Sequence, residues 1–143
     1  MPINRMAKYG VFIGVWNTTG QVLETESNAR GHLSATDTYR WLPGHHYIVH
    51  DVDARFDGNP TRSMEVMGYD PVRKKYFARS FDDQGGTDTY VVSLDGRRWS
   101  IKGTSVRFDG SFDVKWKHLT GLWELKGAKS RWQPWIELKL TRA

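Results

Sequence analysis

The chain has 143 residues with 21 lysines and arginines, 16 aspartates and glutamates, and a formal net charge of +5. It contains no cysteine, which excludes disulfides and thiolate metal sites, and we expect a reducing cytoplasm as its location. No segment resembles a signal peptide or a membrane span, and no linker divides the chain, so we predict one domain over residues 1–143 that does not associate with a membrane.

Turn signals divide the chain into about ten short segments rich in aromatic residues. These signals are Asp57-Gly58-Asn59-Pro60, Asp70-Pro71, Asp82-Asp83-Gln84-Gly85-Gly86, Asp95-Gly96 and Asp109-Gly110. Their spacing of roughly 10 to 14 residues is typical of successive antiparallel hairpins. Since a long meander hides its edges by closing on itself, we predict an all-β fold: a closed antiparallel up-and-down barrel of about 8–10 strands with little helix.

Strand alternation begins early in the chain. Residues 14–24 open the predicted sheet, and the polar residues 25–34 form a loop or one helical turn. A second strand covers residues 35–42 and ends at a Pro-Gly pair. Residues 45–56 then form the longest predicted strand.

The strand over residues 45–56 indicates that the barrel interior contains histidine. Successive side chains of a strand point to opposite faces, and one face of this strand carries three charged residues, which places it outside. His46 and His50 lie on the other face and are therefore predicted to point inward.

The later strands supply further interior candidates. Residues 64–69 and 76–81 form a hairpin whose inward side the pattern leaves open, and alternation places several aromatic side chains inside the strands that follow. The predicted cavity-lining residues are His46, His50, Glu65, Tyr90, Trp99, Trp116, His118 and Trp123. Bulky rings either line a ligand cavity or simply fill the barrel.

The two ends of the chain carry the most specific pattern. Trp16, in a Gly-Val-Trp run, opens the first strand, and Arg142 closes the last. A guanidinium over an indole face contributes roughly 0.5 to 2 kcal/mol and would join these strands where a barrel must close. This combination resembles the lipocalin and calycin superfamily.

A wider pattern resembles a bacterial lipocalin-like family that is catalogued only as a domain of unknown function. It consists of the runs WLPGHHYIVH (41–50), MGYDP (67–71) and WQPWIE (132–137) and extends over nearly the whole chain. The resemblance implies a lipocalin-like barrel and brings no established activity.

Neither a metal nor a cofactor is predicted. His46 and His50 are four residues apart on one strand face and thus lie about 13 Å from each other, whereas each imidazole on a shared zinc lies about 2 Å from the ion. Barrels related to nitrobindin hold haem through a histidine on a late strand; the last strand here has none, and His118 on the preceding hairpin is the alternative ligand. The connection over residues 25–34 is too short for the helical lid of fatty-acid-binding barrels.

The sequence favours a ligand-binding protein over an enzyme. It has no Gly-X-Ser-X-Gly motif and no phosphate-binding glycine loop. We therefore predict a cytoplasmic barrel that binds a small hydrophobic or amphipathic ligand, oriented by His46 and His50. The alternative is a barrel enzyme that uses the same inward acid–base groups.

The surface residues bear on two kinds of macromolecular partner. An oligonucleotide partner is not expected, because the basic residues are dispersed along the chain and no RNA-binding motif is present. Trp132 and Trp135 flank a proline at the start of the last strand, where they form either an exposed patch at the rim or a homodimer contact.

Overall fold

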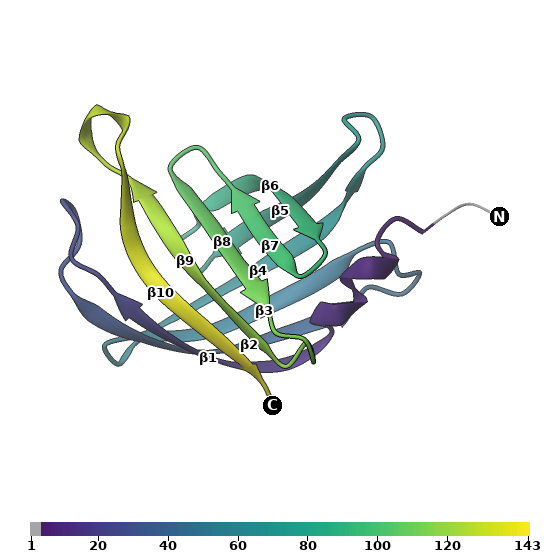
Figure 1. Ribbon diagram of the computed structural model, residues 1–143, viewed down its shortest axis with the longest axis horizontal. Helices are drawn as coiled ribbons and strands as arrows, with labels where there is room; N and C mark the ends of the chain where they lie inside the picture. The colour runs from purple at the N-terminus through teal and green to yellow at the C-terminus, as the bar shows by residue number, and fades with distance from the viewer. Residues whose placement is uncertain (1–3) are drawn as a thin grey trace.

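In the computed structural model, which describes residues 4–143, ten antiparallel strands close into one barrel (Figure 1). The strands are β1 (Gly14–Val22), β2 (Gly31–Trp41), β3 (Ile48–Phe56), β4 (Asn59–Asp70), β5 (Lys75–Asp82), β6 (Thr87–Asp95), β7 (Arg98–Lys102), β8 (Val106–Phe112), β9 (His118–Lys126) and β10 (Trp132–Arg142). Two short 3-10 helices, η1 (Ala7–Phe12) and η2 (Ala128–Ser130), complete the described part. Each strand pairs with its neighbours in the sequence, so the predicted up-and-down barrel is confirmed.

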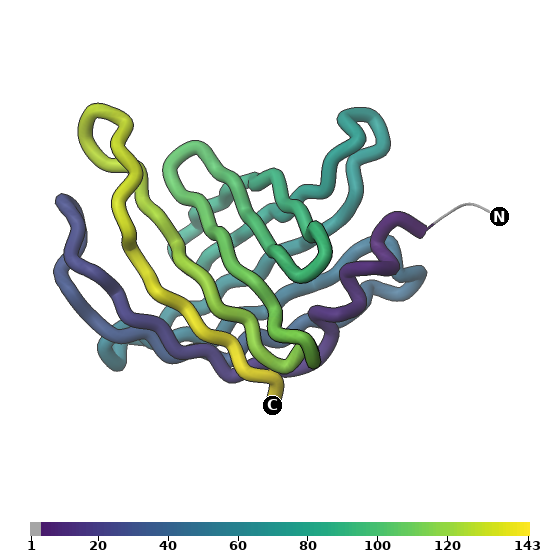
Figure 2. The backbone as a smooth tube through the Cα atoms, in the orientation of Figure 1, coloured from purple at the N-terminus to yellow at the C-terminus, as the bar shows by residue number. Residues whose placement is uncertain are grey.

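The barrel closes where the first strand pairs with the last. β1 and β10 are in antiparallel register from Trp16 opposite Arg142 to Val22 opposite Ile136. Figure 2 shows the two strands side by side along their length. Side chains of β1 alternate between exposed and buried along this pairing, as expected for a strand with one face toward a core.

One half of the barrel interior is filled with side chains. Met6 and two residues of η1, Tyr9 and Phe12, enter the end at which β1 begins. The Phe12 ring lies 4.7 Å from the ring centroid of Trp99 and 5.3 Å from that of Phe112. We call this the closed half; its buried side chains are Met6, Tyr9, Phe12, Trp16, Tyr39, Ile48, Met67, Leu94, Trp99, Phe112, Leu119 and Leu140.

The other half of the interior is only partly covered. Cross-strand partners share a face, so the pairing registers identify which side chains point inward here. We call this the open half; its half-buried inward side chains are Ala35, Val52, Thr61, Ser63, Glu65, Ser80, Tyr90, Trp123, Leu125 and Leu138. It lies toward the β1–β2 and β9–β10 connections, opposite the end that holds η1 (Figure 1).

One predicted turn is wrong. Asp109-Gly110 lies inside β8, where Gly110 pairs with Gly121 of β9. A Cβ built on Gly121 would lie 2.5 Å from the Asp109 carbonyl oxygen and 2.5 Å from the Phe108 ring, so glycine here permits close approach of two strands. The chain turns instead over residues 113–117, where Trp116 has φ 59°.

The surface tryptophans at the start of β10 are partly covered within the chain. The Arg107 guanidinium lies 4.2 Å from the centroid of the Trp132 ring. Trp135 packs against the small buried cluster that includes Val22 and Ile136. A homodimer contact at this rim stays a prediction. Among residues 4–143, no helix is long and apolar enough to cross a membrane.

Candidate functional site

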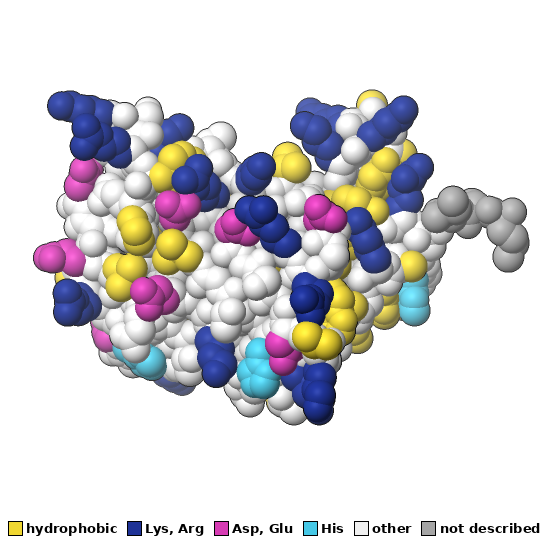
Figure 3. Space-filling model, viewed as in Figure 1, with side chains coloured by type: hydrophobic (Ala, Val, Ile, Leu, Met, Phe, Trp, Pro, Cys, Tyr) yellow, Lys and Arg dark blue, Asp and Glu magenta, His cyan; other side chains and the backbone are white. Residues whose placement is uncertain are grey.

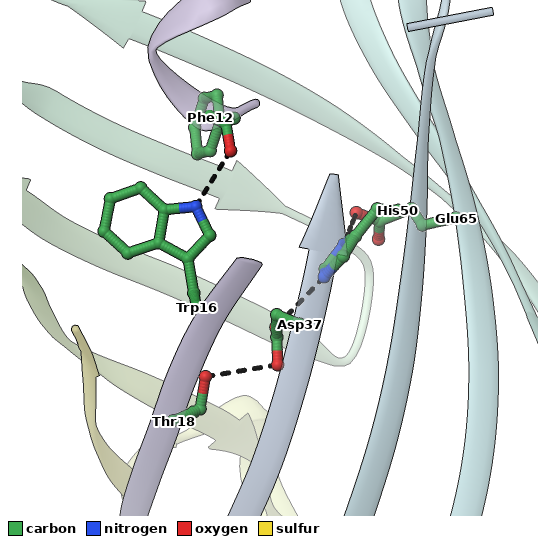
Figure 4. A network of polar contacts seen from close by, with 6 residues as sticks. All are labelled: Phe12, Trp16, Thr18, Asp37, His50 and Glu65. Atoms are coloured by element: carbon green, nitrogen blue, oxygen red, sulfur yellow. Dashed lines mark hydrogen bonds and ion pairs between the residues drawn. The ribbon is translucent and has the colours of Figure 1, made fainter. Parts of the chain in front are cut away.

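A histidine between two carboxylates lies at the boundary of the closed and open halves. His50 of β3 has its Nε2 atom 3.0 Å from Oδ2 of Asp37 on β2 and its Nδ1 atom 3.3 Å from Oε1 of Glu65 on β4. His50 and Glu65 are directly opposite in the β3–β4 ladder. We call Asp37, His50 and Glu65 the carboxylate–histidine triad; Figure 4 shows it reaching across three neighbouring strands.

Neighbouring side chains hold the triad in one orientation. Thr18 on β1 donates its hydroxyl proton to Oδ1 of Asp37 over 3.1 Å. The Tyr39 ring stacks on the His50 ring with centroids 3.9 Å apart and planes 10° apart. Asp37 thus accepts a bond at each oxygen, and the imidazole cannot turn without breaking its stacking and both carboxylate contacts.

Burial and charge act in opposite directions on His50. Burial by itself lowers the pKa of the imidazole, but hydrogen bonds and charges from Asp37 and Glu65 outweigh it and raise the pKa from 6.5 to about 9. His50 is therefore protonated at neutral pH, with one carboxylate group on each side of its ring. The pKa of Tyr39 is raised well above its usual value, first by burial and then by the same two carboxylates, so its phenol stays neutral.

Glu65 also faces the open half. Its side chain is 16% exposed, more than either partner in the triad. Within residues 4–143 only its Oε1 atom accepts a hydrogen bond, which leaves the second oxygen as an available acceptor. The pKa of nearby Tyr90 is raised by burial, is lowered in part by the Ser80 hydroxyl, and is raised again by the charges of Asp88, Glu65 and Asp82.

The open half has two chemically different walls. On β4–β6 the inward side chains are mainly polar and include Thr61, Ser63, Glu65, Ser80 and Tyr90. On β1–β3, β9 and β10 they are apolar and include Val22, Leu33, Ala35, Val52, Ala54, Trp123, Ile136 and Leu138. An apolar wall with a few convergent polar groups is the usual composition of a small-molecule site.

Five of the eight predicted cavity-lining residues lie inside the barrel, and two of them are in contact. The structure brings together His50 and Glu65, places Tyr90 and Trp123 on walls of the open half, and buries Trp99 in the closed half. Trp99 is only 3% exposed and packs against Tyr9 and Phe12, so it fills the barrel instead of lining an accessible cavity.

The predictions for His46 and His118 are wrong, whereas Trp116 is half-buried and packs against Phe112 of the closed half. His46 is exposed in the β2–β3 connection, since β3 begins only at Ile48 and the alternation does not extend back to it. Trp116 lies in the β8–β9 turn, and this turn changes the phase of the next strand. His118 therefore points outward from β9, with Nδ1 3.0 Å from Oδ2 of Asp113.

The haem alternative named His118 as the ligand, and the structure does not place this histidine in the interior. His118 lies on the outer face, and both ring nitrogens of His50 already face carboxylate oxygens. Across residues 4–143, no three histidine, aspartate or glutamate side chains are arranged to hold a metal ion.

Sequence reasoning missed Asp37, Thr18 and Tyr39. Asp37 is 8% exposed and Thr18 is 4% exposed, although both are polar. The signal available was an aspartate two residues before a tyrosine on one predicted strand, since residues two apart share a face. The pairing that joins Asp37 to His50 was not visible in the sequence.

Arg142 lies over Trp16 at the closed end of the barrel. Its guanidinium carbon is 4.2 Å from the indole centroid. Nη1 donates to the Ile13 carbonyl over 2.7 Å, Nη2 donates to the Val11 carbonyl, and Trp116 supplies a further carbonyl acceptor. One side chain thereby ties β10, the segment before β1 and the β8–β9 turn together.

Lysine and arginine side chains do not gather in one patch on the face seen in Figure 3, where they lie among acidic and uncharged ones. The ion pairs Arg98–Asp109 at 2.6 Å and Arg107–Glu124 at 2.7 Å involve basic residues of the outer surface. Such pairs are typical of a solvated barrel wall.

Fold and site together define a lipocalin-like β-barrel with a polar group at its centre. Residues 9–123 match the model of a family described as "Protein of unknown function (DUF1579)", and the chain belongs to this family. The predicted resemblance to a lipocalin-like family of unknown function is confirmed.

Solved structures of other proteins share the fold. Rv2717c from M. tuberculosis is similar with a TM-score of 0.69 and 11% identity, covering 99% of each chain. The S-type phycobiliprotein lyase CPES from Guillardia theta is similar with a TM-score of 0.56 and 6% identity, covering 99% of this chain and 93% of the lyase. At these identities the likeness shows the fold alone. No curated protein matches the sequence.

Proposed function

We propose that the protein binds a small, largely apolar molecule in the open half of the barrel, with the polar end of the molecule at the carboxylate–histidine triad. The observation that carries this proposal is the contrast between the two halves: the closed half is packed, whereas many inward side chains of the open half are only half buried around the small buried cluster that includes Val22 and Ile136. Interiors that serve stability alone are normally filled to the density of an organic crystal.

The composition of the open half supports a ligand of mixed character. Its apolar wall offers contact area to an apolar body, and the triad with Tyr90 offers a few directed polar groups. A ten-stranded barrel also has a wider bore than an eight-stranded one, so side chains alone fill it less readily. The absence of cysteine from the sequence is consistent with a cytoplasmic location, which we retain as part of the proposal.

The test combines a blocking variant with a matched control. Ala35 points inward from β2 and is half-buried, while its neighbour Thr36 is exposed on the outer face. Ala35→Trp should fill the open half and abolish binding of the neutral dye Nile red. Thr36→Trp adds the same side chain outside and should bind the dye as the unmodified protein does.

Native mass spectrometry then examines what the protein retains from cells. A retained small molecule should be present in the unmodified protein and in Thr36→Trp, and absent from Ala35→Trp. Circular dichroism melts of all three proteins establish that the barrel is folded. Equal dye binding by the three folded proteins, with no retained molecule in any, would overturn the proposal.

Acid–base catalysis in the same cavity is the second candidate. It is favoured by a protonated imidazole held between two carboxylates, a set of groups able to give and accept protons. Both ring nitrogens are engaged, so proton exchange with a substrate requires Asp37 or Glu65 to move aside. This candidate predicts that the retained molecule leaves the protein chemically altered, which mass spectrometry before and after incubation would detect.

A further inference from the structure

We infer that the molecule bound in the open half is an amphipathic cation, a protonated amine or similar donor on an apolar body, whose head group binds Glu65. This inference rests on the proposed function and specifies the chemical class of its ligand. It is drawn from the charges that line the interior, the engaged state of His50 and the free acceptor on Glu65.

The interior-facing charges of the open half are mostly negative. Asp37 and Glu65 lie in the triad. Asp82 and Asp88 have the same inward phase on β5 and β6, opposite Ser63 and Ser80, but both are exposed at the rim, and Oδ1 of Asp82 accepts hydrogen bonds from the backbone of the β5–β6 turn. Burial is the first cause of the raised pKa of Tyr90, and the charges of Asp88, Glu65 and Asp82 raise it further. A cation entering this half would be attracted by each of them.

Among residues 4–143, no strand position that faces the open half carries a lysine or an arginine that could offset the charge of these carboxylates. Arg142 is inward but lies in the closed half, over Trp16. Lys102 and Arg107 are opposite each other on the outer face, and Arg107 pairs there with Glu124. The side chains of Lys102 and Arg107 therefore belong to the outer surface of the barrel and not to the open half.

His50 is a cation at the boundary of the open half, and both of its ring nitrogens are already engaged. Each of its ring nitrogens faces a carboxylate oxygen, so a ligand carboxylate could bind the imidazole only by displacing Asp37 or Glu65. Such a ligand would also lie next to the triad carboxylate that remains, without a donor to offset it. An anionic head group is thus opposed by this site.

Glu65 provides the attractive contact. Its Oε1 atom faces His50, its second oxygen accepts no hydrogen bond from residues 4–143, and the side chain is 16% exposed toward the open half. A charged donor that reaches this oxygen would make a charge-assisted hydrogen bond, which is roughly twice as strong as a neutral one. The apolar wall around Leu138 and Val52 would receive the rest of the molecule.

The net charge of the protein helps to distinguish binding in the interior from nonspecific attraction to the surface. The chain has a net charge of +5, which at long range favours anions over cations. A measured preference for a cation would therefore have to originate in the local interior field. Nonspecific attraction to the protein surface would produce the opposite order.

The experiment compares three probes that share one alkyl chain: dodecylamine, dodecanol and dodecanoate, titrated by calorimetry at neutral pH below their aggregation thresholds. We expect the amine to bind about tenfold or more tightly than the alcohol, the gain of one charge-assisted hydrogen bond, and the carboxylate to bind most weakly. Dodecanoate binding as tightly as dodecylamine would overturn the inference.

A variant pair assigns the preference to Glu65. Glu65→Gln should reduce the preference for the amine over the alcohol to within about threefold. Glu137→Gln, on the exposed outer face of β10, should preserve the full preference. A preference that persists in folded Glu65→Gln contradicts the assignment, and the probe order on the unmodified protein remains decisive if that variant does not fold.

The two proposals fail in different ways. Binding of all three probes with the wrong order refutes the cation inference and leaves the interior site intact. Binding of none of them, or equal binding by Ala35→Trp, refutes the proposed function itself.

Discussion

His50 should make the stability of the barrel depend on pH in a predictable direction. In the folded protein its pKa is raised to about 9, whereas an unfolded histidine titrates near 6.5. Protonated His50 therefore stabilises the folded state fully below pH 6.5, and this stabilisation is lost as the pH rises through about 9. The groups that face the ring are Asp37, Glu65 and the stacked phenol of Tyr39.

The size of the effect follows from the two pKa values. Each tenfold change in proton affinity between folded and unfolded states is worth about 1.4 kcal/mol. The rise from 6.5 to about 9 then corresponds to roughly 3 kcal/mol of unfolding free energy. A domain is typically stable by about 5–15 kcal/mol, so the loss should be large enough to measure easily.

Urea unfolding followed by tryptophan fluorescence, repeated across this pH range, measures the prediction. His50→Gln has no ionisable group at this position, so its stability deficit relative to the unmodified protein should shrink by roughly 3 kcal/mol between pH 6.5 and high pH. His46→Gln changes an exposed histidine and should show no such trend. A deficit of His50→Gln that stays constant with pH, or an NMR titration of His50 near 6.5, would refute the reasoning.

Three substitutions test the packing that positions the site. Arg142→Lys should lower the unfolding free energy by about 1–3 kcal/mol, because lysine cannot reproduce the planar contact with Trp16 and the several carbonyl contacts; an unchanged thermal midpoint would contradict this. Phe12→Ala should cost about 3–5 kcal/mol by emptying the centre of the closed half, measured by urea unfolding. Gly121→Ala should cost about 1–3 kcal/mol, since its Cβ would collide with the facing strand, whereas Gly10→Ala has its nearest atom at 3.7 Å and should be tolerated; equal thermal midpoints for these two would rule out the close-approach explanation.

Local sequence patterns were sufficient to predict strands and turns, the elements that repeat along the chain. Alternation of side chains identified β3 and placed His50 inward, and Asp-Gly pairs marked turns such as the one between β3 and β4. These signals depend on neighbours within a few residues, so a single sequence carries them. The same dipeptide gave a wrong turn prediction at Asp109-Gly110, because a glycine also permits the close approach of two strands. Gly110 lies opposite Gly121 of β9, and the sequence alone does not reveal this pairing.

The candidate site depended on information from distant parts of the chain. His50 and Glu65 were both named from sequence, but Asp37 was not, because its role comes from the β2–β3 register. Phe12 likewise became part of the core only through the fold of η1 into one end of the barrel. Patterns among neighbouring residues carry no information about contacts between distant parts of the chain.

What the sequence by itself determined is the succession of strands, the closed barrel and the inward direction of His50, since each follows from a period of two residues and from turns that recur along the chain. The tertiary structure decided which half of the barrel is filled and which carboxylates surround the imidazole. Those features arise from strand register and the docking of η1, and a register shift of one residue would turn Asp37 or Glu65 to the outer face.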